Sequence, residues 1–287
     1  MAAARIPVSK TYKLFIGGQF PRTESGRFLP LHDGQGRLLA NVCRASRKDF
    51  RNAVVAARKA FPGWASASAY LRGQILYRIA EMLESRRDGF VEELTLQGAA
   101  RRAARSEVET SIDRLIHYAG WSDKYTQVFS TVNPVSSPHF NFSIPEPTGV
   151  VALIAPPDTG LLGLVSNLAP ALVGGNTVVA LASERAPLSA VSLAEVIHAS
   201  DVPAGVVNLL TGRAEELAGH FASHMDVNAL VHCGDDALSA GLQTAAAENL
   251  KRLVLRTGRD WSGDDAQDPY LILDTQEIKT TWHPVGG

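Results

Sequence analysis

The sequence predicts an α/β fold built on a parallel sheet with helices on both faces. From Gly149 onward, short β-rich runs alternate with helical runs, which is the pattern of successive βαβ units. Hydrophobic residues make up 45% of the 287-residue chain and charged residues 20%, values that exclude disorder over most of its length. This length allows one or two domains of about 150 residues.

The N-terminal part of the chain is predicted to be mainly helical. Lys13–Gly18 indicates a short strand and a Gly-Gly hairpin turn, and Asp33–Gly36 indicates a second turn. Ser46 is a candidate N-cap with Asp49 three residues later. The pair Pro62-Gly63 is predicted to end the helix that begins there. A second helix carries an apolar stripe from Leu71 to Leu83, and two more are predicted over 88–97 and 105–126.

Residues 127–147 interrupt the helical pattern. This stretch is rich in Ser, Pro and Asn, and the alternation in Phe140–Ile144 predicts a half-exposed strand within a candidate linker. Near the C-terminus, the segments Leu271–Leu273 and Thr280–Trp282 suggest a final strand that no predicted helix accompanies.

The predicted sheet places its candidate ligand site at one edge. Ligands of parallel sheets bind beyond the carboxyl ends of the strands, so the candidate segments are Pro156–Gly160, Leu181–Glu184, Thr211–Gly212 and Cys233–Asp236. The predicted strands are Val150–Ala155, Thr177–Ala182, Val206–Leu210, Ala229–Cys233 and Arg252–Leu255, and the helices between them span 161–173, 187–199, 213–222 and 235–248.

Charge and cysteine content narrow the class of protein. Lys and Arg total 28 and Asp and Glu total 29, a balance that gives no support for nucleic-acid binding. No apolar run approaches the roughly 20 residues that span a bilayer, and the opening MAAARIPVSK has no apolar core for a signal peptide. Cys43 and Cys233 cannot build a disulfide framework. We therefore expect a cytoplasmic protein without a membrane partner.

Several blocks of the sequence carry a family resemblance. They are Tyr118–Tyr125, Glu146–Val150, Leu168–Leu172 with Gly175–Val179, Pro203–Asn208 and Asn249–Arg252. In this order and spacing the chain resembles the aldehyde dehydrogenase superfamily, and within it the second, degenerate half of the double-domain family-16 aldehyde dehydrogenases.

The resemblance implies a cofactor domain with a Rossmann-like sheet and a small β oligomerisation arm. It divides the chain into a flexible tail (1–12), an N-terminal helical part of the cofactor domain (13–127), an oligomerisation hairpin (128–147), the Rossmann-like sheet and helices (148–262) and a C-terminal arm strand (263–287). In the family, about two hundred residues, the size of a domain, separate the last cofactor-domain strand from the tail strand. Here only about twenty do, so the resemblance implies that the catalytic domain is missing.

The resemblance also shows which catalytic groups have changed. No cysteine follows Leu255, where the family places its nucleophile, and Arg256 stands where the family has its general base, a glutamate. An arginine stays protonated at neutral pH and cannot accept a proton. Asp158 replaces the asparagine that donates to the oxyanion, and a carboxylate repels a developing negative charge. We interpret Asp158 as a turn or cap residue and Arg256 as a solvated or ion-paired one.

The expected cofactor site is only partly kept. Glu184, Gly212 and Gly234 match family positions on the adenosine side of NAD, whereas Asp235 and Asp236 stand at the pyrophosphate turn. Carboxylates there act as helix caps and repel a diphosphate. We therefore expect no bound cofactor, with weak NAD binding as the alternative. His232 and Cys233 precede these acids, but neighbours in sequence lack ligand spacing, so no metal site is predicted. We interpret Cys233, at the end of a predicted strand, as a small buried thiol. The alternative is a thiol whose pKa is lowered by the helix start beside it.

Three functions remain open from the sequence. The first is a catalytically inactive, aldehyde dehydrogenase-like module that forms homo-oligomers or associates with a complete aldehyde dehydrogenase. The second is a working NAD(P)-dependent aldehyde dehydrogenase with relocated residues. The third is a sensor that binds NAD or an adenine nucleotide through Glu184 and Gly212 without turnover.

Overall fold

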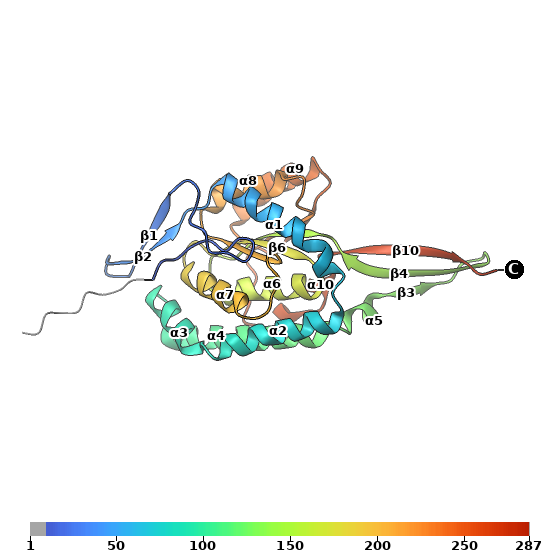
Figure 1. Ribbon diagram of the computed structural model, residues 1–287, viewed down its shortest axis with the longest axis horizontal. Helices are drawn as coiled ribbons and strands as arrows, with labels where there is room; N and C mark the ends of the chain where they lie inside the picture. Colours follow the sequence, from blue (N-terminus) through green and yellow to red (C-terminus); the bar gives the residue numbers. More distant parts are fainter. Residues whose placement is uncertain (1–9, 287) are drawn as a thin grey trace, which may run out of the picture.

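A computed structural model describes residues 10–286 as a layered body with a long arm projecting from one end (Figure 1). A five-stranded sheet lies at the centre of the body. Helices α1, α8 and α9 cover one face of the sheet, α6 and α7 cover the other, and α2, α3 and α4 form a further layer outside α6 and α7 (Figure 1). The predicted α/β class is confirmed.

The elements follow one another in a mostly alternating order from β5 onward. The strands are β1 (Phe28–His32), β2 (Leu38–Cys43), β3 (Thr131–Asn133), β4 (His139–Pro147), β5 (Val150–Ile154), β6 (Thr177–Leu181), β7 (Val207–Leu210), β8 (Ala229–His232), β9 (Arg252–Leu255) and β10 (Gln276–Pro284). The α-helices are α1 (Arg47–Ala65), α2 (Ala69–Glu84), α3 (Arg87–Leu96), α4 (Arg101–Trp121), α5 (Tyr125–Phe129), α6 (Leu162–Val173), α7 (Leu188–His198), α8 (Ala214–Ser223), α9 (Ser239–Ala247) and α10 (Tyr270–Leu273).

The central sheet has the order β7-β6-β5-β8-β9, and every neighbouring pair is parallel. Strands β5 to β8 are buried along their whole length because helices cover both sides of the sheet, whereas the edge strand β9 is only partly buried. Along β5, Val151 and Leu153 pack into one core, and Val150, Ala152 and Ile154 pack into the core on the opposite face. Each of the five strands lies within one residue of its predicted bounds.

Helix α1 starts as predicted but ends later. Ser46 and Asp49 form a reciprocal capping box, in which each side chain accepts from the other residue's backbone N–H. The predicted end at Pro62-Gly63 is wrong, since α1 continues to Ala65. Trp64 explains the extra turn, because its ring is buried and its Nε1–H donates to the Leu172 carbonyl at 3.1 Å. Burial of this side chain offsets the hydrogen bond that the proline removes.

The N-terminal segment contains more strand than the sequence indicated. The predicted Gly-Gly turn is present, with Gly17 and Gly18 at positive φ and paired backbone bonds between Ile16 and Gln19. The turn at Asp33–Gly36 joins β1 and β2, an antiparallel pair that the sequence did not predict. Of the expected tail, residues 1–9 lie outside the described residues, while the Lys10 side chain bonds Ser192 and Glu195 on α7.

Three other segments also differ from the secondary structure predicted for them. The helix predicted over 105–126 is divided into α4 and the short α5, and α4 begins four residues earlier. The segment 235–248 begins as a single 3-10 turn and becomes α9 only at Ser239. Leu271–Leu273 is helical (α10) rather than part of the last strand. No helix among residues 10–286 combines the length and apolarity needed to cross a membrane.

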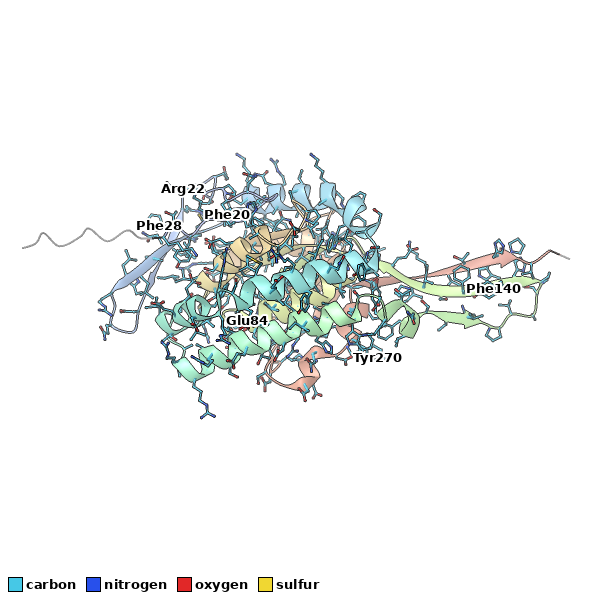
Figure 2. All side chains as sticks on the ribbon, turned by 60° about the horizontal axis from the view of Figure 1, so that its bottom comes forward. Phe20, Arg22, Phe28, Glu84, Phe140 and Tyr270 are labelled. Atoms are coloured by element: carbon cyan, nitrogen blue, oxygen red, sulfur yellow. The ribbon has the colours of Figure 1, made fainter. Side chains whose placement is uncertain are left out.

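The arm is a three-stranded antiparallel sheet in the order β10-β4-β3. β4 and β10 pair without a bulge along nine residues, from Gln276 opposite Pro147 to Pro284 opposite His139. The strand predicted at Phe140–Ile144 and the strand predicted at Thr280–Trp282 therefore form one sheet. Figure 2 shows the arm standing clear of the body, with Phe140 well along it and Tyr270 near its base.

Candidate functional site

The carboxyl edge of the central sheet carries a cavity of about 480 Å³. Its walls come from the segments that follow β5, β6 and β8 and from the first residue of α8, and they include Glu184 and Gly234. The topology thus brings these predicted residues together as expected for a parallel sheet. Gly212 does not line the cavity. It is packed against Ala45, two residues after β2, where a Cβ would lie 3.3 Å from the Ala45 backbone nitrogen.

Glu184 is engaged by the neighbouring helix. Its Oε1 accepts a hydrogen bond from the backbone N–H of Ala214, the first residue of α8. The N-cap residue of α8, Arg213, supplies no side-chain cap, so Glu184 takes that role from another loop. Its negative charge also lies at the positive end of the helix dipole. A ligand hydroxyl at this oxygen would have to compete with the cap.

The two acids after β8 behave differently from each other. Asp235 caps the 3-10 turn, since its Oδ1 accepts from the Ala237 N–H at 2.9 Å, as predicted. Asp236 is not a backbone cap, which corrects the prediction. Its Oδ1 instead accepts the hydroxyls of Ser239 at 3.0 Å and Thr257 at 3.1 Å. Both carboxylates are exposed at the turn where the family resemblance places a diphosphate.

Asp158 lies in the turn after β5 and points to solvent. Its side chain is 73% exposed, and its Oδ1 lies 3.4 Å from the Arg185 guanidinium. The turn assignment is confirmed, but the N-cap alternative is wrong. Glu107 of α4 holds the start of α6 instead, accepting from the backbone N–H groups of Leu161 at 2.7 Å and Leu162 at 3.1 Å. Sequence reasoning missed Glu107 because nothing in the local pattern of α4 points to α6.

Arg256 is buried directly after β9. Its side chain is 4% exposed, and its Nη2 donates to Asp274 Oδ2 at 2.7 Å. Its Nη1 donates to Asn167 Oδ1 of α6 at 2.6 Å. The prediction of an ion-paired arginine is confirmed, with the addition that the guanidinium is buried while its partner Asp274 stays 40% exposed. Arg256 therefore joins the sheet to α6 and to the segment that follows α10.

Cys233 is a buried thiol with a raised pKa. It is 1% exposed, and burial raises its pKa to about 12, while the nearby Arg256 and Arg259 oppose this shift only in part. The prediction of a small buried thiol is confirmed. The alternative, a thiol whose pKa is lowered by the adjacent helix start, is wrong, because desolvation outweighs the dipole of a single 3-10 turn. Cys43 ends β2 and is also buried. His232, fully buried beside Cys233, bonds the Asp235 carbonyl through Nε2 at 2.9 Å. Within residues 10–286 there is no group of three or more His, Cys, Asp or Glu arranged to hold a metal ion.

A family model described as "Aldehyde dehydrogenase family" matches residues 22–274. The chain belongs to the aldehyde dehydrogenase family. It is 31% identical to a mitochondrial benzaldehyde dehydrogenase of Antirrhinum majus over 95% of this chain and 50% of that protein. It is 34% identical to retinal dehydrogenase 2 of Gallus gallus over 87% of this chain and 49% of that protein.

Solved structures of aldehyde dehydrogenases have the same fold. An NAD+ complex of the aldehyde dehydrogenase from Bacillus cereus matches with a TM-score of 0.82 and 28% identity, over 87% of this chain and 51% of that one. PnpE from Pseudomonas sp. WBC-3 matches with a TM-score of 0.83 and 30% identity, over 87% and 51%. The chain thus spans about half the length of the aldehyde dehydrogenases that it matches.

Proposed function

We propose that this chain is a non-catalytic aldehyde dehydrogenase-like module whose arm associates with a second subunit, either another copy or a complete aldehyde dehydrogenase. The observation that carries the proposal is Arg256. At the position where the family resemblance places the general base, a guanidinium is buried and bonded to Asn167 and Asp274. This group cannot accept a proton, and its bonds hold it in a structural role.

The other catalytic positions support the same conclusion. Asp158 offers no N–H donor to an oxyanion, and Cys233 is buried with a raised thiol pKa. Only about twenty residues connect β9 to β10, where the family carries its catalytic segment. The β10 strand nevertheless keeps its pairing with β4 along nine residues. The chain thus keeps the arm of the family, whereas the residues that the family uses for aldehyde oxidation are replaced.

The residues at the sheet edge do not fit the diphosphate of NAD. Helix N-termini bind phosphates through free N–H groups, and here carboxylates already occupy them. Glu184 caps α8, Asp235 caps the turn before α9, and Glu107 caps α6. These charges would also repel a diphosphate.

The cavity that contains Glu184 and Gly234 favours one alternative, a nucleotide sensor without turnover. Its volume of about 480 Å³ suits the adenosine part of a nucleotide. Changing both Asp235 and Asp236 to lysine should then tighten NADH binding, because the positive charges would face the phosphates. Unchanged affinity would count against the sensor.

Three measurements on the purified chain test the proposal: aldehyde-dependent NADH formation, NADH binding, and association with a second subunit. Aldehyde-dependent NADH formation should be absent, both in the natural chain and in Arg256→Glu. In a titration with NADH, tryptophan emission should show no saturable quenching up to millimolar concentration. Turnover would overturn the non-catalytic assignment, and saturable quenching at micromolar NADH would favour the sensor. A chain that stays monomeric and does not co-elute with a complete aldehyde dehydrogenase of its own organism would contradict the association.

A further inference from the structure

The outer edge of β2 borders a second cavity, of about 530 Å³, which shares no lining residue with the cavity at the carboxyl edge of the central sheet. Its walls are β2, the segment that leads into β1, and the first three described residues of the chain. Among the described residues, the basic side chains of Lys10, Arg22 and Arg27 line it and no acidic side chain does. Figure 2 shows Arg22 and Phe28 at the end of the body opposite the arm.

The basic side chains of this cavity differ in how far they are neutralised. Lys10 lies 3.1 Å from an acidic side chain of α7. Arg27 is 44% exposed and lies 3.5 Å from Glu216. The same carboxylate also pairs with Arg44, so one negative charge serves two guanidinium groups. The end of the cavity that contains Arg27 therefore carries excess positive charge.

Arg22 adds a free charge at the same end. It is exposed, and within residues 10–286 its side chain has no ion pair or hydrogen bond. Glu24, the acidic residue nearest to it in the sequence, is already bonded to Ser46 at 3.0 Å and to Lys48 at 3.1 Å. A guanidinium without a partner can form two parallel hydrogen bonds to a carboxylate, sulfonate or phosphate group.

Apolar side chains extend along the rest of the cavity. Phe28 begins β1 and is 59% exposed, and Leu38 begins β2 and is 56% exposed. Phe28 lies opposite Cys43, at the basic end of β2, whereas Leu38 lies at the other end of the strand. A strand of six residues, at about 3.3 Å per residue, separates these ends by roughly 17 Å. The cavity thus has a charged end and an apolar end.

Backbone groups of β2 also face the cavity. The Arg44 N–H donates to the Arg27 carbonyl, so the even-numbered residues of β2 point their backbone groups toward β1. Because these directions alternate along a strand, the N–H and C=O groups of Leu39, Asn41 and Cys43 point away from β1.

Only part of this outward edge is occupied. Tyr12 bridges β2 in parallel, and the Thr211 hydroxyl donates to the Cys43 carbonyl at 2.6 Å. Farther along, the N–H groups of Leu39 and Asn41 have no hydrogen-bond partner within residues 10–286. Two free backbone donors therefore lie between the basic end and the apolar end.

We propose that this cavity binds an amphipathic organic anion, in which a carboxylate, sulfonate or phosphate group is attached to an elongated aromatic or aliphatic body. Arg22 and Arg27 bind the anionic head, and Phe28 and Leu38 cover the body. The free N–H groups of β2 donate to polar atoms of the ligand. A volume of about 530 Å³ and an apolar wall with a few polar groups are typical of such sites. The site does not depend on the proposed function, so the two can fail separately.

The test titrates the full chain with 8-anilinonaphthalene-1-sulfonate, an aromatic sulfonate whose emission rises in apolar surroundings. We expect one saturable site per chain. Arg22→Glu places a negative charge beside the head and should weaken binding at least about tenfold. Phe28→Ser removes apolar contact with the body and should weaken binding about threefold or more.

Two matched variants serve as controls. Arg101→Glu makes the same charge change at an exposed arginine at the start of α4. Val132→Ser removes an apolar side chain that is 68% exposed on the arm. Both should bind the sulfonate as the natural chain does. Urea unfolding of all four variants checks that each keeps the stability of the natural chain.

Two further measurements examine the head and the strand edge. Raising the KCl concentration from about 0.05 M to about 0.5 M should weaken binding, because salt screens the two arginines. Inorganic phosphate at about 10 mM should not displace the sulfonate, since it has no apolar body. Amide hydrogen exchange at Leu39 and Asn41 should slow when the sulfonate is bound, because these N–H groups lose their access to water.

The outcomes distinguish the site from unspecific binding. The site is overturned if the sulfonate does not saturate the chain at up to millimolar concentration, or if Arg22→Glu and Phe28→Ser bind it as tightly as the natural chain. An equal loss in Arg101→Glu would mean that net charge sets the affinity, which also overturns the site. Displacement by inorganic phosphate overturns the amphipathic class of ligand. None of these results bears on the association or inactivity proposed above.

Discussion

Replacing Arg256 by methionine is expected to destabilise the fold by about 2–4 kcal/mol. The substitution removes hydrogen bonds of 2.6 Å to Asn167 and 2.7 Å to Asp274. A bond to a charged group contributes about 1.5–3 kcal/mol, and Asn167, 3% exposed, would keep an unpaired buried oxygen. Two effects keep the total cost below the sum of the two hydrogen bonds. Asp274 is 40% exposed, so water replaces its lost partner, and the variant no longer has a charged guanidinium to desolvate on folding.

Arg252 provides a matched control on the same strand. Its side chain is 37% exposed and pairs with Glu277, itself 45% exposed, at 3.0 Å. An exposed ion pair of this kind contributes at most about 1 kcal/mol, so Arg252→Met should have a small effect. Urea unfolding of both variants, followed by tryptophan emission, gives the two differences in free energy of unfolding.

A double-mutant cycle then isolates the ion pair. Combining Arg256→Met with Asp274→Asn should cost less than the two single changes added together, with a coupling energy of about 1 kcal/mol or more. Equal losses of stability for the Arg256 and Arg252 variants, or a cycle without coupling, would refute the structural role assigned to Arg256.

Three further predictions concern individual side chains. Glu107→Ala should destabilise the protein by about 1–2 kcal/mol in urea unfolding through loss of the α6 cap, while the exposed Glu109→Ala should stay within about 0.5 kcal/mol of the natural chain. Cys233 should resist iodoacetamide at pH 8 in the folded protein and react after unfolding; labelling of the native state, read by mass spectrometry, would contradict its burial. Burial lowers the pKa of Lys251 to about 8, from an ordinary 10.5. Between pH 8 and pH 10.5 the native state therefore binds fewer protons than the unfolded state, and this lysine makes the free energy of unfolding rise with pH. Lys251→Met should flatten the rise in urea unfolding at successive pH values, whereas the exposed Lys59→Met should keep it.

The sequence by itself determined the features that depend on neighbours in the chain. The alternation of apolar strands and helices placed β5 to β9 within one residue, because β5 to β8 are buried on both faces and read as short apolar runs between helical segments. Ser46 and Asp49 identified the start of α1, since a capping box involves only residues three apart. The replaced family positions Asp158 and Arg256 were also visible from the sequence.

Only the tertiary structure decided what those residues contact. Glu107 caps α6 from a helix more than fifty positions earlier, and Arg256 finds Asn167 across the core, so no local pattern encodes either bond. The sequence favoured a buried thiol at Cys233, whereas the rise of its pKa depends on the packing of the whole sheet edge, which removes solvent from around the thiol. Local hydrogen bonds and periodic burial can be predicted from spacing along the chain, whereas desolvation and long-range pairing arise only when distant segments are packed together.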